Sequence, residues 1–336
     1  MEIEVVVYIT GDTHGEFDRF NKRSLKYHNL EFSDKDYVIV CGDFGLCWAK
    51  DKTFEYNCQF FEECNFTTLW VQGNHSNYDM IKEYPLEEWQ GGKVRHIIRD
   101  KVLLLERGQV FTLEGKKYFT FGGARSHDVD GGILNREEPE FQDDRRRAIE
   151  CGLPFRILHE SWWKEELPDK EELEEGRKNL QKVDYEVDYV ITHCCSSMAQ
   201  KELERIFGYA LENDILTDYL DELENTLKYK QWYFGHYHEN LNLDQKHTLL
   251  YTAMIQAGDT GKDLEHIPIP GKPYFHYQDP VNIQWKGETK EGVICGIDAY
   301  GTFGQKEEPS YDVYISKENC LYKHIRESEI LNLYDS

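Results

Sequence analysis

Short apolar runs recur along the chain up to about residue 255, and a glycine or a polar residue follows each run. The runs are rich in β-branched and aromatic residues and lack polar alternation, which is typical of strands buried on both faces of a sheet. Segments of helical character, such as 51–65 and 198–229, separate several of them. This pattern predicts a layered fold of the α/β or α+β class. The predicted strands lie within 5–15, 37–45, 68–77, 118–128, 189–197, 232–238 and 249–255.

Two regions depart from this pattern. Residues 134–182 are charge-rich and helical, with Asp169 as a candidate helix cap, and we interpret them as a helical insertion. The insertion is either a cap near the functional site or a surface elaboration. From about residue 262 the composition shifts to Pro, Gly and Tyr, and apolar and polar residues then alternate between turn signals. We therefore expect a main domain of residues 1–262 and a small β-rich domain of residues 263–336.

The amino-acid composition narrows the range of possible functions and of cellular compartments. The formal net charge is −24, which disfavours broad binding to duplex nucleic acid, although a local basic groove would still permit a nuclease. An acidic field of this kind attracts metal cations. The 9 cysteines include no C-x-x-C pair, so they predict neither a disulfide framework nor a structural zinc site. The N-terminal apolar run is too short for a signal peptide or a membrane span, and we expect a cytoplasmic protein with no membrane association.

Side chains that bind metals follow five of the predicted strands. In an open α/β sheet, ligands bind at the carboxyl ends of the strands, so these side chains are expected to converge. A single histidine is more often a structural residue, but this repetition favours a metal centre. Carboxylate and imidazole ligands without thiolates suit Mn, Fe or Zn, and their number favours two divalent ions that share a bridge. The residues are Asp12, His14, Asp43, Asn74, His75, His193, His236 and His238.

Glycines directly precede the polar residues at four of these strand ends. The backbone is expected to turn sharply there and to approach another segment or the ions closely, which only glycine permits without a clash. Ordinary turn glycines are the alternative. The four positions are Gly11, Gly42, Gly73 and Gly235.

The blocks GDTHG, GDFG, GNHSN, THCCS and GHYH occur in this order within residues 11–238. They resemble the pattern D-x-H, G-D, G-N-H, H and G-H-x-H of the calcineurin-like metallophosphoesterase superfamily, and the resemblance covers about residues 1–258. It implies a hydrolase with a four-layer αββα sandwich. The blocks FGGARSHD and SWWKEELP are similar, more loosely, to segments of bacterial and phage members.

The resemblance also implies a role for each metal-binding residue. The first metal ion would be held by Asp12, His14 and His238. The second would be held by Asn74, His193 and His236. Asp43 would bridge the two ions together with a water or hydroxide, and His75 would contact the phosphate and help to protonate the leaving oxygen. His75 and Asp43 are thus the implied catalytic residues.

The chain departs from the protein Ser/Thr phosphatase branch at two positions. GDFGLCW lacks the arginine of G-D-x-x-D-R-G, and Ser76 stands where an acidic residue would orient His75, with Asp79 as a candidate substitute. Arg125 is the expected replacement for the missing arginine, because arginine suits bidentate phosphate contact. A salt-bridged structural arginine is the alternative at that position. The further candidate substrate contacts are His127 and Asn77.

The leading hypothesis is a dinuclear metal-dependent phosphoesterase that hydrolyses phosphomonoesters or phosphodiesters by metal-activated water. The acidic charge and the lack of a basic stripe favour a small nucleotide-like substrate. The alternatives are a metal-dependent nuclease and a non-catalytic scaffold that binds a partner. For residues 263–336, binding of a protein partner, self-association, substrate binding and simple stabilisation all stay open.

Overall fold

The computed structural model of the chain describes residues 5–27, 30–259, 268, 270–271, 273–302, 305 and 308–333. The chain divides into two compact units. The first comprises Met1–Gly15 and Phe32–Leu264, and the second comprises Glu16–Glu31 and Glu265–Ser336. The domain boundary near residue 262 stays a prediction, and residues 16–31 belong to the second unit.

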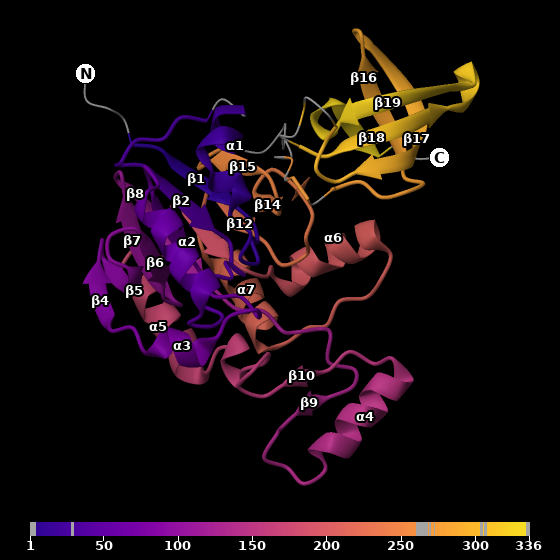
Figure 1. Ribbon diagram of the computed structural model, residues 1–336. Coiled ribbons are helices and arrows are strands. Elements are labelled where there is room, and N and C mark those ends of the chain that lie inside the picture. The colour runs from indigo at the N-terminus through magenta and orange to yellow at the C-terminus, as the bar shows by residue number, and fades with distance from the viewer. Residues whose placement is uncertain are drawn as a thin grey trace. The chain divides into compact units, whose positions relative to one another are not determined.

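The first unit contains a seven-stranded sheet in the order β15-β1-β2-β3-β6-β5-β4 (Figure 1). Strands β1, β2, β3 and β6 run parallel to one another, with antiparallel strands on both sides. The strands are β1 (Val7–Thr10), β2 (Tyr37–Val40), β3 (Thr67–Trp70), β4 (Leu86–Trp89), β5 (Gly92–Ile98), β6 (Val102–Leu105) and β15 (Met254–Gln256).

A six-stranded sheet in the order β13-β14-β12-β11-β8-β7 packs against the first. Strands β8, β11, β12 and β14 are parallel, and β7 and β13 are the antiparallel edges. The strands are β7 (Gln109–Leu113), β8 (Lys116–Phe121), β11 (Tyr189–Thr192), β12 (Gln231–Phe234), β13 (Leu241–Asn242) and β14 (His247–Leu249).

The central strands bury both of their faces, as predicted, because successive side chains point to opposite sides. Ile9 and Ile39 of the first sheet share a core with Ile191 and Tyr233 of the second. On the other face of the second sheet, Trp232 and its neighbours pack against helices. These helices are α5 (Lys170–Gln181), α6 (Ser197–Phe207) and α7 (Ile215–Thr226).

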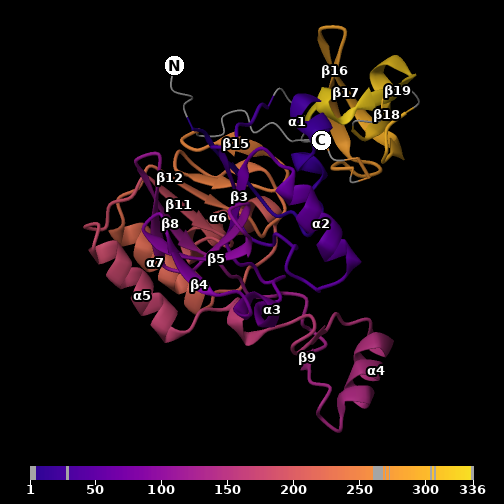
Figure 2. The same ribbon diagram turned by 60° about the vertical axis from the view of Figure 1, so that its left-hand side comes forward.

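Helices also cover the outer face of the first sheet. Phe61 of α2 (Lys52–Glu62) contacts the ring of Phe44, which contacts Trp70 of β3. In Figure 2, α2 lies on the side of the sandwich opposite α5 and α7. The short helix α3 (Tyr78–Lys82) follows β3 in the chain. Two sheets between two helical layers confirm the predicted αββα sandwich.

Two predicted elements are each divided in the structure. The single strand expected at 249–255 is wrong, because β14 and β15 belong to different sheets. Between them the amide oxygen of Asn240 accepts hydrogen bonds from the backbone of Tyr251 and Ala253, so the chain crosses between sheets instead of continuing as a strand. The helical segment 198–229 is two helices, because Gly208 ends α6 in a left-handed conformation and Asp214 caps α7.

The predicted insertion of residues 134–182 contains two different parts. Its second part is α5, where Asp169 forms the expected capping box and Leu173 and Leu180 are buried in the core of the sandwich. Its first part holds α4 (Phe141–Cys151) and β10 (Arg156–Ile157), which pairs with β9 (Ile133–Leu134). This part projects from the sheets in Figures 1 and 2. A 3-10 helix, Lys164–Glu166, connects the two parts.

The second unit contains a five-stranded antiparallel sheet in the order β19-β18-β17-β16-β20, which confirms the predicted small β module. Its core includes Val281, Ile294 and Tyr311. The strands are β16 (Pro280–Trp285), β17 (Glu288–Asp298), β18 (Ser310–Ile315), β19 (Cys320–Arg326) and β20 (Ile330–Leu333). The unit also has helix α1 (Lys22–Tyr27) and the 3-10 helices Asp18–Phe20, Ser316–Glu318 and Glu327–Glu329. Across all the described residues, no helix combines the length and apolarity that a membrane span requires.

Candidate metal centre

The predicted metal-binding residues lie at the carboxyl ends of five parallel strands, three from the first sheet and two from the second. Asp12 and His14 follow β1, Asp43 follows β2, and Asn74 follows β3. In the second sheet, His193 follows β11, and His236 and His238 follow β12. The two sheets therefore present these side chains at one common edge, although the residues are far apart in the sequence.

A first group of donors is formed by Asp12, His14 and His238. The Nε2 atoms of the two histidines are 2.9 Å apart, and Asp12 Oδ2 lies 3.3 Å from His238 Nε2. The ligand atoms of the three residues all lie within 4.8 Å of one another. Two imidazole nitrogens and a carboxylate at this spacing suit a shared divalent cation.

A second group is formed by Asp12, Asp43 and His193, all of them buried. His193 Nδ1 lies 2.7 Å from the carbonyl oxygen of Cys41 and donates its proton there, so Nε2 is the ring atom that would bind a metal. Nε2 lies 3.3 Å from Asp43 Oδ2 and 3.2 Å from Asn74 Oδ1. This backbone contact therefore fixes the ring in the orientation that a metal ligand needs.

His236 joins the second group through its ring, whose centroid is 5.0 Å from that of His193. Its backbone N–H donates to both carboxylate oxygens of Asp12, at 3.1 Å each. The backbone N–H of His75 similarly donates to Asp43 Oδ1 at 2.8 Å. Backbone donors thus orient both carboxylates toward the centre.

The charges at the site fit a cationic occupant. Burial opposes ionisation of Asp43, yet the neighbouring His193 lowers the pKa of this carboxyl well below its ordinary value. Conversely, burial opposes protonation of His193, but Asp43 and Asp12 raise its pKa to about 9. Two ionised carboxylates that hold a proton on a buried imidazole would equally favour a divalent cation, so the donor set fits a transition metal.

Four of the clustered side chains extend from strained backbone. Non-glycine residues seldom adopt positive φ, and such strain is often found at functional sites. The left-handed residues at the centre are His14 (φ 48°), Asp43 (φ 42°), His236 (φ 73°) and His238 (φ 54°).

The predicted close approach at the four glycines is confirmed. At Gly11, a Cβ atom would lie 1.9 Å from the carbonyl oxygen of Leu250. At the other three positions it would lie within 2.1 Å of a side chain of the centre. These clashes pair Gly42 with His193, Gly73 with Asp43, and Gly235 with Asp12.

Arg156 of β10 lies beside the centre, although it belongs to no recognisable motif. Its Nη2 atom is 3.4 Å from Nδ1 and 3.3 Å from Nε2 of His75. Its side chain is only 14% exposed, and its Nε donates to Asp128 Oδ1 at 2.8 Å. Asp128 is the last residue of the FGGARSHD block. That block is the sequence feature from which an arginine paired with Asp128 near the site could have been inferred.

The two loosely similar blocks lie in direct contact. Ser126 donates from its backbone to Glu166 Oε1 at 3.1 Å and from its hydroxyl to Glu166 Oε2 at 2.6 Å. Glu166 belongs to the SWWKEELP block and is 3% exposed. Ser126 Oγ also lies 3.5 Å from Asn74 Nδ2, so this contact supports the loop next to the centre.

Arg125 and His127 of the FGGARSHD block, both expected to contact the substrate, have different surroundings in the structure. Arg125 is 48% exposed and pairs with Glu212 at 3.0 Å, as in the alternative of a salt-bridged arginine. His127 lies close to the centre, with its ring centroid 5.4 Å from that of His236. Of these two residues, His127 is the one that faces the clustered histidines.

Asn77 and Asp79 have structural partners. The amide of Asn77 caps α3 by accepting from the backbone of Met80, and its Nδ2 donates to the carbonyl of Trp48. Asp79 Oδ2 lies 2.7 Å from His159 Nδ1 and accepts from Trp163 Nε1 at 2.7 Å. The suggestion that Asp79 orients His75 is therefore wrong, because the side chain of Asp79 is engaged with His159 and with Trp163 of the SWWKEELP block.

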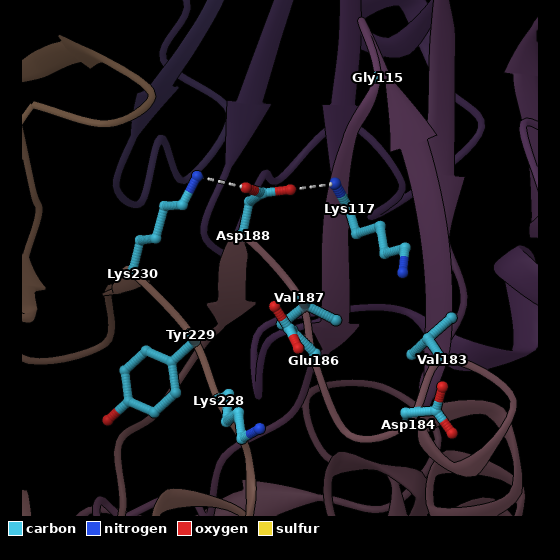
Figure 3. Close-up of a pocket in the computed structure, with 10 residues that line it drawn as sticks. All are labelled: Gly115, Lys117, Val183, Asp184, Glu186, Val187, Asp188, Lys228, Tyr229 and Lys230. Atoms are coloured by element: carbon cyan, nitrogen blue, oxygen red, sulfur yellow. Dashed lines mark hydrogen bonds and ion pairs between the residues drawn. The ribbon is translucent and has the colours of Figure 1, made fainter.

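A separate pocket of about 400 Å³ lies at the opposite edge of the second sheet (Figure 3). Lys117 is near the start of β8, Asp188 precedes β11, and Lys230 precedes β12. Asp188 accepts from the backbone of Lys117 at 2.9 Å and pairs with Lys230 at 2.7 Å. Since this pocket lies at the amino ends of the strands, it is not part of the candidate metal centre.

Comparison with known proteins agrees with the geometry. The family model described as calcineurin-like phosphoesterase matches residues 5–240. No curated protein matches the chain. Among solved structures, the chain is similar to a phosphopantetheinyl hydrolase from Mycobacterium tuberculosis, with 12% identity over 75% of this chain and 90% of that chain and a TM-score of 0.34. That likeness is too low to inform the substrate. The family match covers most of the chain and every strand end of the site, and the chain belongs to the calcineurin-like phosphoesterases, a family of metal-dependent hydrolases of phosphate esters.

Proposed function

We propose that the chain hydrolyses small, nucleotide-like phosphate esters at a centre of two divalent transition metal ions, which would be Mn, Fe or Zn. The observation that carries this proposal is the convergence of carboxylate, amide and imidazole donors from five strand ends at one edge of the sandwich. The acidic chain favours a small ester over a nucleic acid backbone.

The proposed ligand sets are those that the family resemblance implies, and the first of them coincides with the first donor group. For the first ion, we propose Asp12, His14 and His238. For the second, we propose Asn74, His193 and His236. Asp43 is the proposed bridge, because its carboxylate lies beside His193 and also opposes the effect of burial on the pKa of His14 in the first group. Two divalent ions held in this way would supply Lewis acidity that activates water and stabilises charge on the phosphate.

Arg156 and His75 are the proposed phosphate-positioning pair. The guanidinium of Arg156 is planar and rich in donors, which suits a phosphate better than a point charge does. Its ion pair with Asp128 holds it against His75. Arg156 would therefore take over the phosphate contact that the family arginine makes in the Ser/Thr phosphatase branch, and Arg125 would remain a surface residue.

His75 is the proposed donor of a proton to the leaving oxygen. Burial lowers the pKa of its ring below the ordinary value, and the nearby charge of Arg156 lowers it further, whereas Asp43 opposes both effects. A phosphate bound between His75 and Arg156 would add negative charge next to the ring. This charge would favour the protonated form of His75 in the substrate complex.

The test combines metal analysis with turnover of a chromogenic monoester and a chromogenic diester, using protein purified without chelator. We expect bound metal and hydrolysis of at least one of the two esters. Asp43→Asn should remove most of the bound metal and the turnover, whereas Asp34→Asn, at an exposed turn, should retain both. Turnover of Asp43→Asn at the rate of the unsubstituted protein would contradict the proposal.

A further inference from the structure

A cavity of about 670 Å³ adjoins the candidate metal centre. His236 and His238 line one side of it, and His127 lines another. The remaining walls come from the loop after β8, from Cys194, from α6 and the first turn of α7, and from the segment that connects these two helices. The volume falls within the usual range for small-molecule sites. An ester whose phosphate binds at the centre would therefore have space here for its alcohol part.

Gln200 of α6 is one of the residues that line this cavity, and its side chain has an unused acceptor. The residue is 6% exposed, and its Nε2 donates to Tyr237 Oη at 3.2 Å and to the carbonyl of Glu212 at 3.5 Å. Within the described part of the chain, the buried Oε1 atom accepts no hydrogen bond. Buried polar atoms are nearly always paired, so an unpaired carbonyl on a residue that lines a cavity is a candidate acceptor for a ligand.

Tyr209 supplies an aromatic face to the same cavity. It follows the C-terminal glycine of α6, and its ring stacks on Phe207 with centroids 5.6 Å apart and an interplanar angle of 18°. The residue is nevertheless 57% exposed. One face of the ring is thus supported by the protein, and a flat ligand could stack on the exposed part.

The charge of the lining disfavours a second anionic group on the ligand. Asp130, Glu212 and Asp214 all line the cavity. The positive charge of Arg125 is balanced by Glu212 at 3.0 Å. A neutral group that donates hydrogen bonds fits this environment, whereas a chain of further phosphates would be repelled.

We infer that this cavity binds the base of a nucleotide, with Tyr209 as the stacking surface and Gln200 Oε1 as the acceptor for an exocyclic amine. The inference rests on the proposed function, because it places the phosphate of the same nucleotide at the metal centre. A nucleobase combines a flat aromatic face, a donor edge and no charge, which are the three properties that the lining selects.

The first experiment compares AMP with ribose 5-phosphate, which has the same phosphate and sugar but no base, by following released phosphate. If the protein hydrolyses only diesters, the methyl esters of both compounds replace them, and the released alcohol is followed instead, because hydrolysis of a diester yields an alcohol and a monoester but no free phosphate. We expect kcat/KM to be about tenfold or more higher for the compound with the base, since stacking and one hydrogen bond together reach that range. IMP, which carries a carbonyl in place of the amine, should be a poorer substrate than AMP.

Two substitutions test the named residues. Gln200→Met keeps the length of the side chain but removes the acceptor, so it should abolish the preference for AMP over IMP. Tyr209→Ala should raise the KM for AMP about tenfold and change kcat/KM for ribose 5-phosphate less than twofold. Tyr209→Phe keeps the ring and should keep the preference. Matched controls are Gln181→Ala and Tyr56→Ala, both at exposed positions on other helices, and they should match the unsubstituted protein.

The second experiment measures adenosine binding by calorimetry, which needs no turnover. Saturable adenosine binding that Tyr209→Ala weakens at least tenfold supports the inference, even if no ester tested is hydrolysed. The absence of hydrolysis would instead count against the proposed function. Equal kcat/KM for AMP and ribose 5-phosphate, together with no adenosine binding, would overturn the inference and leave the proposed function intact. Tyr209→Ala or Gln200→Met with unchanged selectivity would likewise overturn the assigned roles.

Discussion

Arg156 Nη2 lies 3.3 Å from Nε2 of His75, although the two residues are 81 positions apart in the sequence. His75 belongs to a motif at the end of β3, whereas Arg156 lies in the short strand β10 of the projecting segment. The ion pair between Arg156 and Asp128 keeps the guanidinium in place. A segment outside the family motif thus delivers a cation to the motif histidine.

Arg156→Ala should lower kcat/KM for a phosphate ester about tenfold to a hundredfold, the range expected when a charge-assisted hydrogen bond of about 1.5–3 kcal/mol is lost. Arg156→Lys should recover only part of this loss, because a lysine cannot form a planar fork. Steady-state kinetics measure both effects. Arg147→Ala is the matched control, since it removes the same charge from an exposed position on α4. An Arg156→Ala protein as active as this control would argue against a role in phosphate positioning.

Gly42→Ala should greatly reduce metal content, because its Cβ would lie 2.1 Å from His193 Nδ1 and displace the ring from the Cys41 carbonyl. Gly115→Ala is the matched control: φ is +71° there, and among the described residues no atom would lie within 4 Å of its Cβ. That substitution should cost about 1–2 kcal/mol of unfolding free energy for left-handed backbone but leave metal content unchanged. Elemental analysis and chemical denaturation measure the two quantities. Equal metal loss in both proteins would show that backbone strain, and not the clash with His193, is responsible.

Ser126→Ala should destabilise the metal-free protein by about 1–3 kcal/mol near pH 7.5, because buried Glu166 would lose its hydroxyl donor. Burial already raises the pKa of Glu166 in the folded protein above the ordinary value that it has in the unfolded chain. In the pH interval between these two pKa values, the folded protein binds more protons than the unfolded chain. The contribution of Glu166 to stability therefore decreases as the pH rises through this interval, and the loss of Ser126 should widen the interval.

The cost of Ser126→Ala should accordingly be smaller at pH 5 than at pH 7.5, as measured by urea unfolding. Glu166→Gln, which cannot ionise, should remove this difference when it is combined with Ser126→Ala. A destabilisation that is the same at both pH values would mean that the charge of Glu166 is not the cause.

The strand ends of the candidate site could be predicted because local sequence specifies them. Each apolar run is short and leads directly into its polar residue, so the strand and the side chain at its end are found together. The sheets then bring these ends to one edge by parallel pairing, as between Ile9, Ile39 and Leu69. The αββα layering follows from the same runs, because strands buried on both faces require layers on both sides.

Features that depend on distant side chains could not be predicted in this way. The break within 249–255 depends on Asn240, whose amide oxygen binds backbone groups 11 and 13 residues later. Arg156 lies in a strand of 2 residues, and its position depends on pairing with Asp128. Asn77 fits a substrate contact by its place in the motif, but its amide caps a helix that is only 5 residues long and has little apolar periodicity to reveal it.

The most direct test of the central claim is a titration of the metal-free protein with Mn²⁺, in which bound metal and hydrolysis of a chromogenic ester are followed together. The proposed centre predicts negligible turnover without metal and a rise that reaches its plateau when about two ions are bound per chain. Full turnover in the metal-free protein, or a plateau at one bound ion, would contradict a dinuclear centre.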